Sequence, residues 1–106
     1  MSKPLYKVTF LNSGKIYELY AGRVGSSHLW GFNEVSELMF DLHNGVVVDP
    51  TEERLRDEFG NTRVLHLPIQ SIVRIEEVEK KGQSAIRDAS TGEKVVTPFP
   101  MPGKPR

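Results

Sequence analysis

The stretch LPIQSIVRIEEVEKKG, residues 67–82, decides the fold of this chain because it fits two incompatible structures. Its isoleucines and its last valine recur at every third residue, as they would along one side of a helix (Ile69, Ile72, Ile75, Val78). In the same stretch, Val73 and Ile75 alternate with charged residues, which is the period of a half-buried strand. Both interpretations start from Pro68, because proline restricts the preceding residue to extended geometry.

A helix over this stretch would gain favourable pairs between its glutamates and the lysines four residues later. A strand is favoured because Ile72, Val73 and Ile75 are all β-branched and lose side-chain freedom in a helix. We therefore predict one 3₁₀ turn over residues 68–71 and a strand over residues 72–79. This strand would turn Val73 and Ile75 toward the core, and it would turn three charged residues toward water (Arg74, Glu76, Lys80).

Upstream, residues 5–24 have the alternation of a β-hairpin, with turn chemistry at residues 12–14. Residues 29–40 are predicted to form a third strand, and a helix from about Asn33 is the competing interpretation. A short strand is expected at residues 46–48. The next segment predicts a helix that ends at Gly60, with an N-cap, a proline at the first helical position, a capping-box glutamate and two apolar contacts (Asp49, Pro50, Glu52, Leu55, Phe59). A strand over residues 63–67 follows.

The predicted fold is therefore mainly β: a small bent antiparallel sheet, or an SH3-like or Sm-like partly open barrel, with one short α-helix. The chain has 106 residues and no cysteine, and 38% of its residues are hydrophobic. This length allows a single domain, which we assign to residues 1–87. Residues 88–106 contain four of the seven prolines and are predicted to form a disordered tail. The sequence has neither a signal peptide nor a membrane span, so we expect a cytoplasmic protein that does not bind membranes.

Four stretches together resemble a family of small bacterial proteins, about a hundred residues long, that is catalogued as a domain of unknown function. They are YKVTFLNSGKIYELYA, WGFNEVSELMF, VVVDPTEERLRDEF and LPIQSIVRIEEVEKKG, and they span most of residues 5–82. The family carries no assigned reaction, ligand or catalytic residue, so the resemblance implies nothing about activity.

No pattern in the sequence predicts catalysis, a cofactor or a metal site. Adjacent Ser27 and His28 would point to opposite sides of a strand, and no nucleophile-elbow motif accompanies them. His66 is interpreted as a polar cross-strand position. The one acidic cluster has no established metal-ligand spacing (Asp41, His43, Asp49, Glu52, Glu53). We therefore expect a protein that is not an enzyme.

The remaining hypothesis is a non-catalytic interaction module that binds another protein, or a second copy of itself, through a sheet edge or an acidic helix surface. Its candidate residues are two aromatic residues beside Gly31 and four acidic residues of the predicted helix (Trp30, Phe32, Glu52, Glu53, Asp57, Glu58). The alternative is a small β-barrel that binds RNA or single-stranded nucleic acid through scattered basic residues (Lys7, Lys15, Arg23, Arg63, Arg74). No linear cluster of basic residues exceeds the Lys80-Lys81 pair, which disfavours this alternative.

Overall fold

The computed structural model describes residues 3–40 and 50–93, which form six strands, one α-helix and one 3₁₀ turn. In chain order the elements are β1 (Leu5–Asn12), β2 (Lys15–Ser26), β3 (Phe32–Met39), α1 (Pro50–Phe59), β4 (Val64–Pro68), η1 (Ile69–Ser71), β5 (Ile72–Val78) and β6 (Ala85–Asp88). The mainly β prediction is confirmed. The predicted strand over residues 46–48, the N-cap Asp49 and most of the predicted tail lie outside the described residues.

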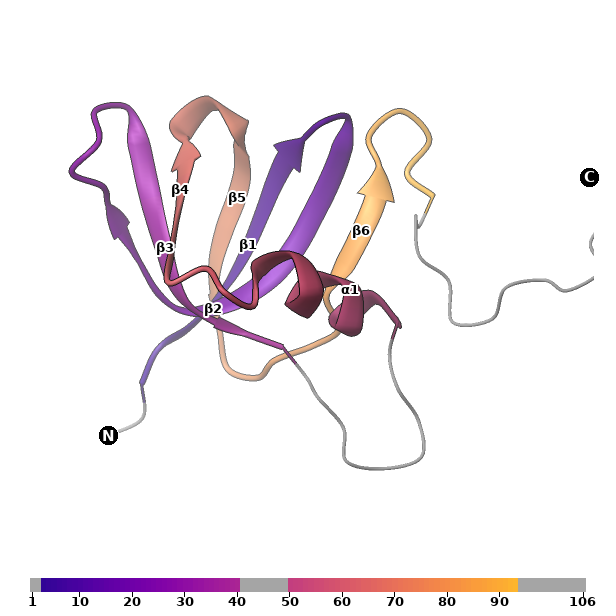
Figure 1. Cartoon of the computed structure of the whole chain (residues 1–106), viewed down its shortest axis with the longest axis horizontal. Helices are drawn as coiled ribbons and strands as arrows, with labels where there is room; N and C mark the ends of the chain where they lie inside the picture. Colours follow the sequence, from indigo (N-terminus) through magenta and orange to yellow (C-terminus); the bar gives the residue numbers. More distant parts are fainter. Residues whose placement is uncertain (1–2, 41–49, 94–106) are drawn as a thin grey trace, which may run out of the picture.

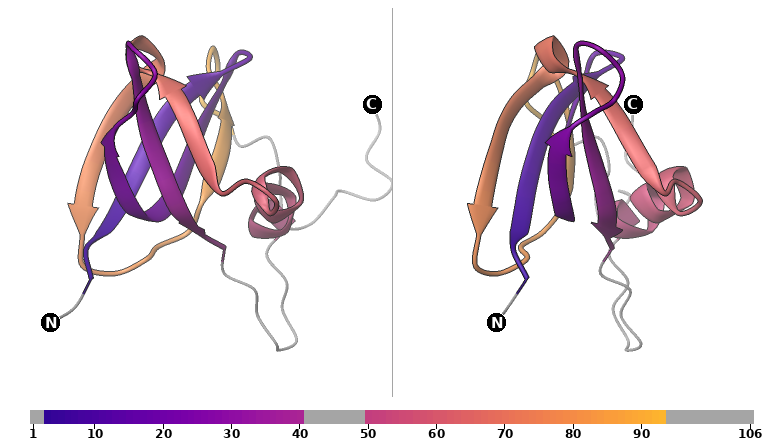
Figure 2. Two further views of the ribbon diagram at one scale, coloured as in Figure 1. Left: turned by 60° about the vertical axis from the view of Figure 1, so that its left-hand side comes forward. Right: turned by 90° about the vertical axis from the view of Figure 1, so that its left-hand side faces the viewer.

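All six strands belong to one antiparallel sheet in the order β4-β3-β2-β1-β5 (Figure 1). Strand β2 is long enough to pair with β6 through Lys15–Glu18 and with β3 through Tyr20–Ser26, both along its second edge. The sheet bends strongly, so that η1 joins its two outermost strands, β4 and β5 (Figure 2). These strands are not paired with each other, and the sheet is not closed into a barrel.

Strand β5 contains a β-bulge at Val73, which explains why residues 67–82 show the three-residue period of a helix. Strand β5 pairs with β1 in one register from Leu5–Val78 to Thr9–Arg74, and then Phe10 pairs with Ile72. Val73 is the extra residue, and its side chain is 62% exposed. The bulge lets Ile72 and Ile75 both pack against the core, although they are three residues apart. The predicted strand is confirmed, but the prediction that Val73 faces the core is wrong.

A second irregularity, between β2 and β3, changes which side chains face the core. On β2, Ala21 and Val24 both contact the core, although they are three residues apart along the strand. Their partners on β3, Leu38 and Val35, do the same. The change of side occurs at Gly22 and at Glu37, whose φ is +57°. Regular alternation through residues 29–40, on which the strand prediction was based, therefore holds for only part of β3.

The core lies on the concave side of the sheet and is covered at one end by α1 (Figure 1). Leu55 and Phe59 of α1 are buried there, as the predicted four-residue spacing requires. The Tyr17 ring stacks on Phe10 at 5.1 Å and meets the edge of Phe59 at 6.1 Å. Ile86 of β6 closes this side of the core and is 1% exposed. No helix within residues 3–40 or 50–93 has the length and apolarity needed to cross a membrane.

Candidate functional site

The most exposed large apolar side chain in the described ranges is Trp30, at 95%. It lies in the turn that joins β2 to β3, residues 27–31, which we call the Trp30 turn. Backbone hydrogen bonds hold this turn: Phe32 N–H donates to the Leu29 carbonyl at 3.1 Å, and Ser27 N–H donates to the Phe32 carbonyl at 3.2 Å. Gly31 takes a φ of +80°, which a residue with a side chain rarely adopts. The indole is thus presented on an ordered turn.

Two further exposed apolar residues belong to the Trp30 turn or to the segment hydrogen-bonded to it. Leu29 belongs to the same turn and is 41% exposed, and Ile69 is 53% exposed. The Ile69 N–H donates to the Gly31 carbonyl at 2.9 Å, which ties η1 to the Trp30 turn. Phe32, the other aromatic candidate beside Gly31, is only half-exposed at the start of β3. Trp30, Leu29 and Ile69 are thus exposed on two segments that a backbone hydrogen bond joins, and sequence reasoning found only the first of the three.

The two outermost strands, β4 and β5, carry features that oppose pairing with another chain. Strand β5 has the bulge at Val73, and its Arg74 Nε contacts Glu76 Oε2 at 2.6 Å. Strand β4 is five residues long and ends at Pro68, which has no N–H to donate. Bulges, charges, proline and short length are the usual protections of a sheet edge. Edge pairing is therefore less supported than contact through the Trp30 turn.

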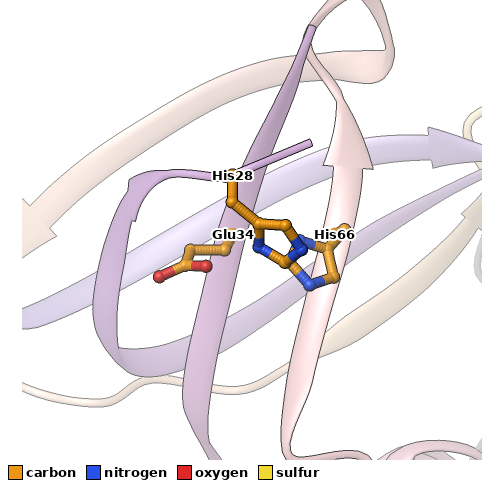
Figure 3. Close-up of side chains that lie close together, drawn as sticks. All are labelled: His28, Glu34 and His66. Carbon is orange, nitrogen blue, oxygen red and sulfur yellow. The ribbon is translucent and has the colours of Figure 1, made fainter. Parts of the chain in front are cut away.

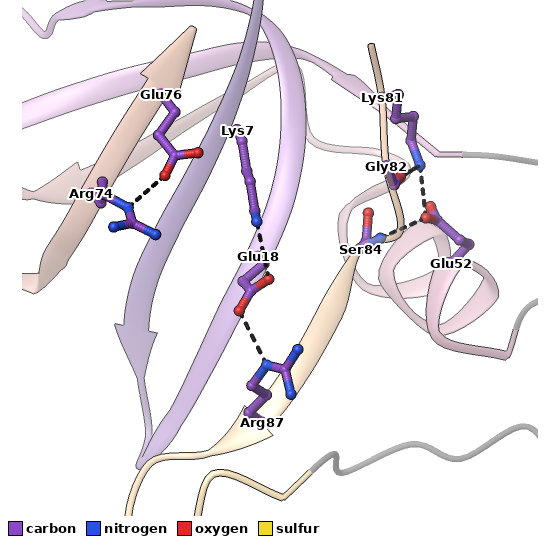
Figure 4. A network of polar contacts seen from close by, with 9 residues as sticks. All are labelled: Lys7, Glu18, Glu52, Arg74, Glu76, Lys81, Gly82, Ser84 and Arg87. Atoms are coloured by element: carbon purple, nitrogen blue, oxygen red, sulfur yellow. Dashed lines mark hydrogen bonds and ion pairs between the residues drawn. The ribbon is translucent and has the colours of Figure 1, made fainter. Parts of the chain in front are cut away.

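The acidic helix surface is smaller than the sequence predicted. Glu53, Asp57 and Glu58 are exposed, whereas Glu52 is only 2% exposed. The Glu52 carboxylate accepts hydrogen bonds from Lys81 Nζ at 2.7 Å and from the Ser84 N–H at 3.0 Å (Figure 4). Glu52 thus fixes α1 to the segment before β6. The prediction that Glu52 lies on an exposed docking surface is wrong.

Glu58 of the acidic helix is exposed, but its carboxylate also contacts Tyr17 of the core. The Tyr17 hydroxyl donates to its carboxylate at 3.3 Å. Burial, and then the charge of Glu58, raise the pKa of Tyr17 above its usual value. The remaining exposed acids, Glu53 and Asp57, both lie near the Arg56 guanidinium, at 4.0 and 3.5 Å. One guanidinium can offset at most one of these two carboxylates, and the neutral Tyr17 hydroxyl leaves Glu58 charged, so α1 keeps part of its acidic surface.

The candidate basic residues come from different strands and loops, and two of the five have close acidic neighbours. Lys7 lies 3.5 Å from Glu18, which also binds Arg87 at 3.1 Å (Figure 4). Arg74 is paired with Glu76. Strand β2 begins at Lys15 and also contains Arg23, whereas Arg63 directly precedes β4. Acidic neighbours thus offset the charge of two of the five residues.

The structure also brings together a cluster that sequence reasoning missed. His28, Glu34 and His66 each offer a ligand atom, and these atoms lie within 4.8 Å of one another (Figure 3). Glu34 of β3 is paired directly with His66 of β4, and His28 comes from the Trp30 turn. The His28 and His66 rings meet edge to face, with centroids 5.4 Å apart. Only the pairing of β3 with β4 could have revealed this group, because its members span 39 residues.

Ser27 is hydrogen-bonded to this cluster. Its Oγ lies 2.7 Å from His66 Nδ1 and accepts the Leu29 N–H at 2.9 Å. The serine thus contacts the distant His66 and not the adjacent His28 that the sequence analysis considered. A serine next to an imidazole is the minimum that a nucleophile requires. The absence of catalysis stays a prediction.

Open cavities of 280, 340 and 560 Å³ are found in the described ranges, and none includes Ser27 in its lining. The cavity of 280 Å³ lies between the end of β1, β4 and α1, and apolar side chains predominate in its lining (Phe10, Leu11, Phe59, Leu65, Leu67, Pro68). Three members of the acidic cluster considered in the sequence analysis lie outside the described residues (Asp41, His43, Asp49).

The fold and these surfaces define a small β-rich domain with an exposed tryptophan turn and a histidine cluster. The chain belongs to the family described as a domain of unknown function, DUF1820, which it matches over residues 4–101. This confirms the predicted family and extends the match beyond the stretches that suggested it. No curated protein and no solved structure matches the chain, so the SH3-like or Sm-like likeness stays a prediction.

Proposed function

We propose that this domain is a non-catalytic interaction module of the cytoplasm that binds a protein partner through the Trp30 turn. The contact surface would consist of Trp30, Leu29 and Ile69. The observation that supports the proposal is the nearly complete exposure of one tryptophan on a hydrogen-bonded turn. Tryptophan is the residue type most enriched among the side chains that dominate protein–protein binding energies.

The physical argument is that an ordered, exposed indole can be buried at low cost. A tryptophan side chain buries roughly 200 Å², which corresponds to about 5 kcal/mol of hydrophobic free energy before the costs of association are subtracted. The backbone of the Trp30 turn is held from both sides, by β3 and by η1, so little loop entropy remains to be lost on binding. Leu29 and Ile69 would supply the surrounding contacts that exclude water.

The partner that fits this surface is a protein with an apolar pocket large enough for an indole ring. Within the described ranges, the edges of β4 and β5 are protected by a bulge, a charge pair and a proline, and Glu52 of the acidic helix is buried, which favours the Trp30 turn over these two surfaces. A second copy of the chain could bind the indole only if it carried such a pocket. Capture of the chain by itself in the experiment below would indicate self-association.

The experiment is affinity capture from the native cell extract with three forms of the protein, each with and without nuclease. We expect the wild type to retain a specific protein, and Trp30→Ala to lose at least about 2 kcal/mol of binding, roughly thirtyfold in affinity. Met39→Ala is the matched control, because Met39 is also exposed but lies at the opposite end of β3. Equal capture by wild type and Trp30→Ala contradicts the proposal.

The nucleic-acid alternative is tested in the same extracts and by titration with mixed oligonucleotides. Binding through phosphates weakens steeply as salt is added, because condensed counterions are released. A salt-sensitive shift that is lost on replacing Arg23 and Arg63 would favour the alternative. Nuclease-resistant capture that depends on Trp30 would favour the protein partner.

A further inference from the structure

We infer that His28, Glu34 and His66 form a binding site for a divalent transition-metal ion of the zinc class. The inference does not rest on the protein-binding proposal, because it uses different side chains and a different chemistry, although His28 and Ser27 belong to the same turn as Trp30. It starts from the convergence of two imidazoles and one carboxylate, whose ligand atoms lie within 4.8 Å of one another.

The backbone brings two of the ligands together. Glu34 and His66 are direct partners in the antiparallel pairing of β3 with β4, so their side chains leave the sheet on the same face. The flanking pairs, Asn33–Leu67 and Val35–Leu65, follow the same register, and Val35 and Leu67 are buried on the other face. The backbone positions of both ligands are thus fixed by two strands anchored in the core.

The third ligand comes from the Trp30 turn and can adjust. Zinc bonds of about 2.0–2.2 Å place two tetrahedral ligands about 3.4 Å apart, so the observed separations must shorten by roughly 1.5 Å at most. His28 is exposed, and rotation of its side chain meets little resistance. The edge-to-face contact of the two rings already directs His28 toward His66 (Figure 3).

Ser27 supplies the outer support that histidine ligands usually have. Its Oγ lies 2.7 Å from His66 Nδ1 and is itself held by the Leu29 N–H at 2.9 Å. When the Nδ1 proton is donated to Ser27, the lone pair of Nε2 is available to a metal ion. Such second contacts fix the tautomer and orientation of a ligating histidine, and their loss commonly lowers metal affinity 10- to 100-fold.

The ligand set selects the class of ion. Imidazole nitrogens suit zinc, cobalt, nickel, copper and iron, whereas magnesium and calcium require mainly oxygen ligands. Three protein ligands leave at least one coordination position for water or for a side chain of another molecule. Because His28 belongs to the Trp30 turn and His66 to β4, a bound ion would also cross-link the turn to the sheet.

The test is titration of the full chain with Zn²⁺ alone, followed by calorimetry, and with Co²⁺, followed by its visible absorption. We expect one ion per chain and a cobalt spectrum of low coordination number. His66→Ala and His28→Ala should each weaken binding at least tenfold, and Ser27→Ala should weaken it about tenfold without removing a ligand. Acidification should also weaken binding, because the imidazoles must be unprotonated to bind.

His43→Ala is the matched control, because His43 is the one histidine of the full sequence that is not among the three proposed ligands. It should bind like the wild type. The inference is overturned if the wild type binds no Zn²⁺, or if His28→Ala and His66→Ala both bind as the wild type does. Because His28 is exposed, its replacement should leave folding intact, which keeps the test decisive even if His66→Ala is unstable.

Discussion

Replacing Glu52 should destabilise the domain strongly, although the sequence suggests a surface glutamate. The carboxylate is 2% exposed and accepts hydrogen bonds from the Lys81 ammonium and from the Ser84 N–H. Glu52→Ala leaves a buried N–H without its acceptor, at a cost of about 1–3 kcal/mol. It also leaves a lysine without its counter-charge, and breaking a buried ion pair costs about 3–5 kcal/mol.

The two costs do not add in full. The Lys81 side chain is 19% exposed and keeps a contact of 3.1 Å to the Gly82 carbonyl, so water and backbone replace part of the lost interaction. We therefore expect Glu52→Ala to lower the free energy of unfolding by about 3 kcal/mol. Glu52→Gln retains an acceptor for the Ser84 N–H and should cost about 1–2 kcal/mol.

The assay is equilibrium unfolding in urea, with Glu53→Ala as the matched control. Glu53 is the next residue of the same helix, but it is exposed, and its carboxylate comes no closer than 4.0 Å to the Arg56 guanidinium. Its replacement should change stability by less than about 0.5 kcal/mol. Equal effects of the two substitutions would refute the reasoning, because they would mean that the Glu52 contacts do not hold α1 to the segment before β6.

Three further predictions concern the core. Ile75→Ala should cost about 2–4 kcal/mol, whereas Val73→Ala should cost less than about 0.5 kcal/mol; equal costs in urea would contradict the bulge. The raised pKa of Tyr17 contributes stability that is present below about pH 10 and is lost as pH rises through the folded pKa, so Tyr17→Phe should flatten the alkaline fall of the melting temperature. Parallel curves for the two proteins would refute this. Ser84 Oγ is buried without a partner in the described ranges, so Ser84→Ala should maintain or raise the melting temperature, and a clear drop would reveal a missed hydrogen bond.

The sequence was sufficient to predict elements whose local signals agreed. The hairpin of β1 and β2 followed from alternation and turn residues, and Pro50 and Gly60 framed α1 as predicted. The 3₁₀ turn and the strand after Pro68 were also predicted correctly, although their signals conflicted, because β-branched residues outweighed the three-residue period. In each case local propensity and the tertiary packing favour the same structure.

Side-chain orientation was predicted less well, because bulges change it without altering composition. The bulge at Val73 and the change of side at Gly22 and Glu37 allow a spacing of three residues to satisfy a β core. The three-residue period of the apolar side chains in residues 67–82 therefore resembled that of a helix. Neither irregularity has a local sequence signature strong enough to predict it.

The candidate sites depended on contacts between distant residues. Trp30 was chosen because it adjoins Gly31, but its exposure could be known only from the fold. Glu52 resembled its exposed neighbours until its contact with Lys81, 29 residues away, was known. The histidine cluster depends in the same way on the pairing of Glu34 with His66.

The most direct test of the proposed function is photo-crosslinking in living cells from a photoreactive phenylalanine analogue at position 30. The analogue is placed at position 39 as the control, since both side chains are exposed and lie at opposite ends of β3. We predict a discrete adduct with one protein from position 30 that is absent from position 39. No adduct at position 30, or the same adducts from both positions, would contradict the claim that the Trp30 turn is the partner-binding surface.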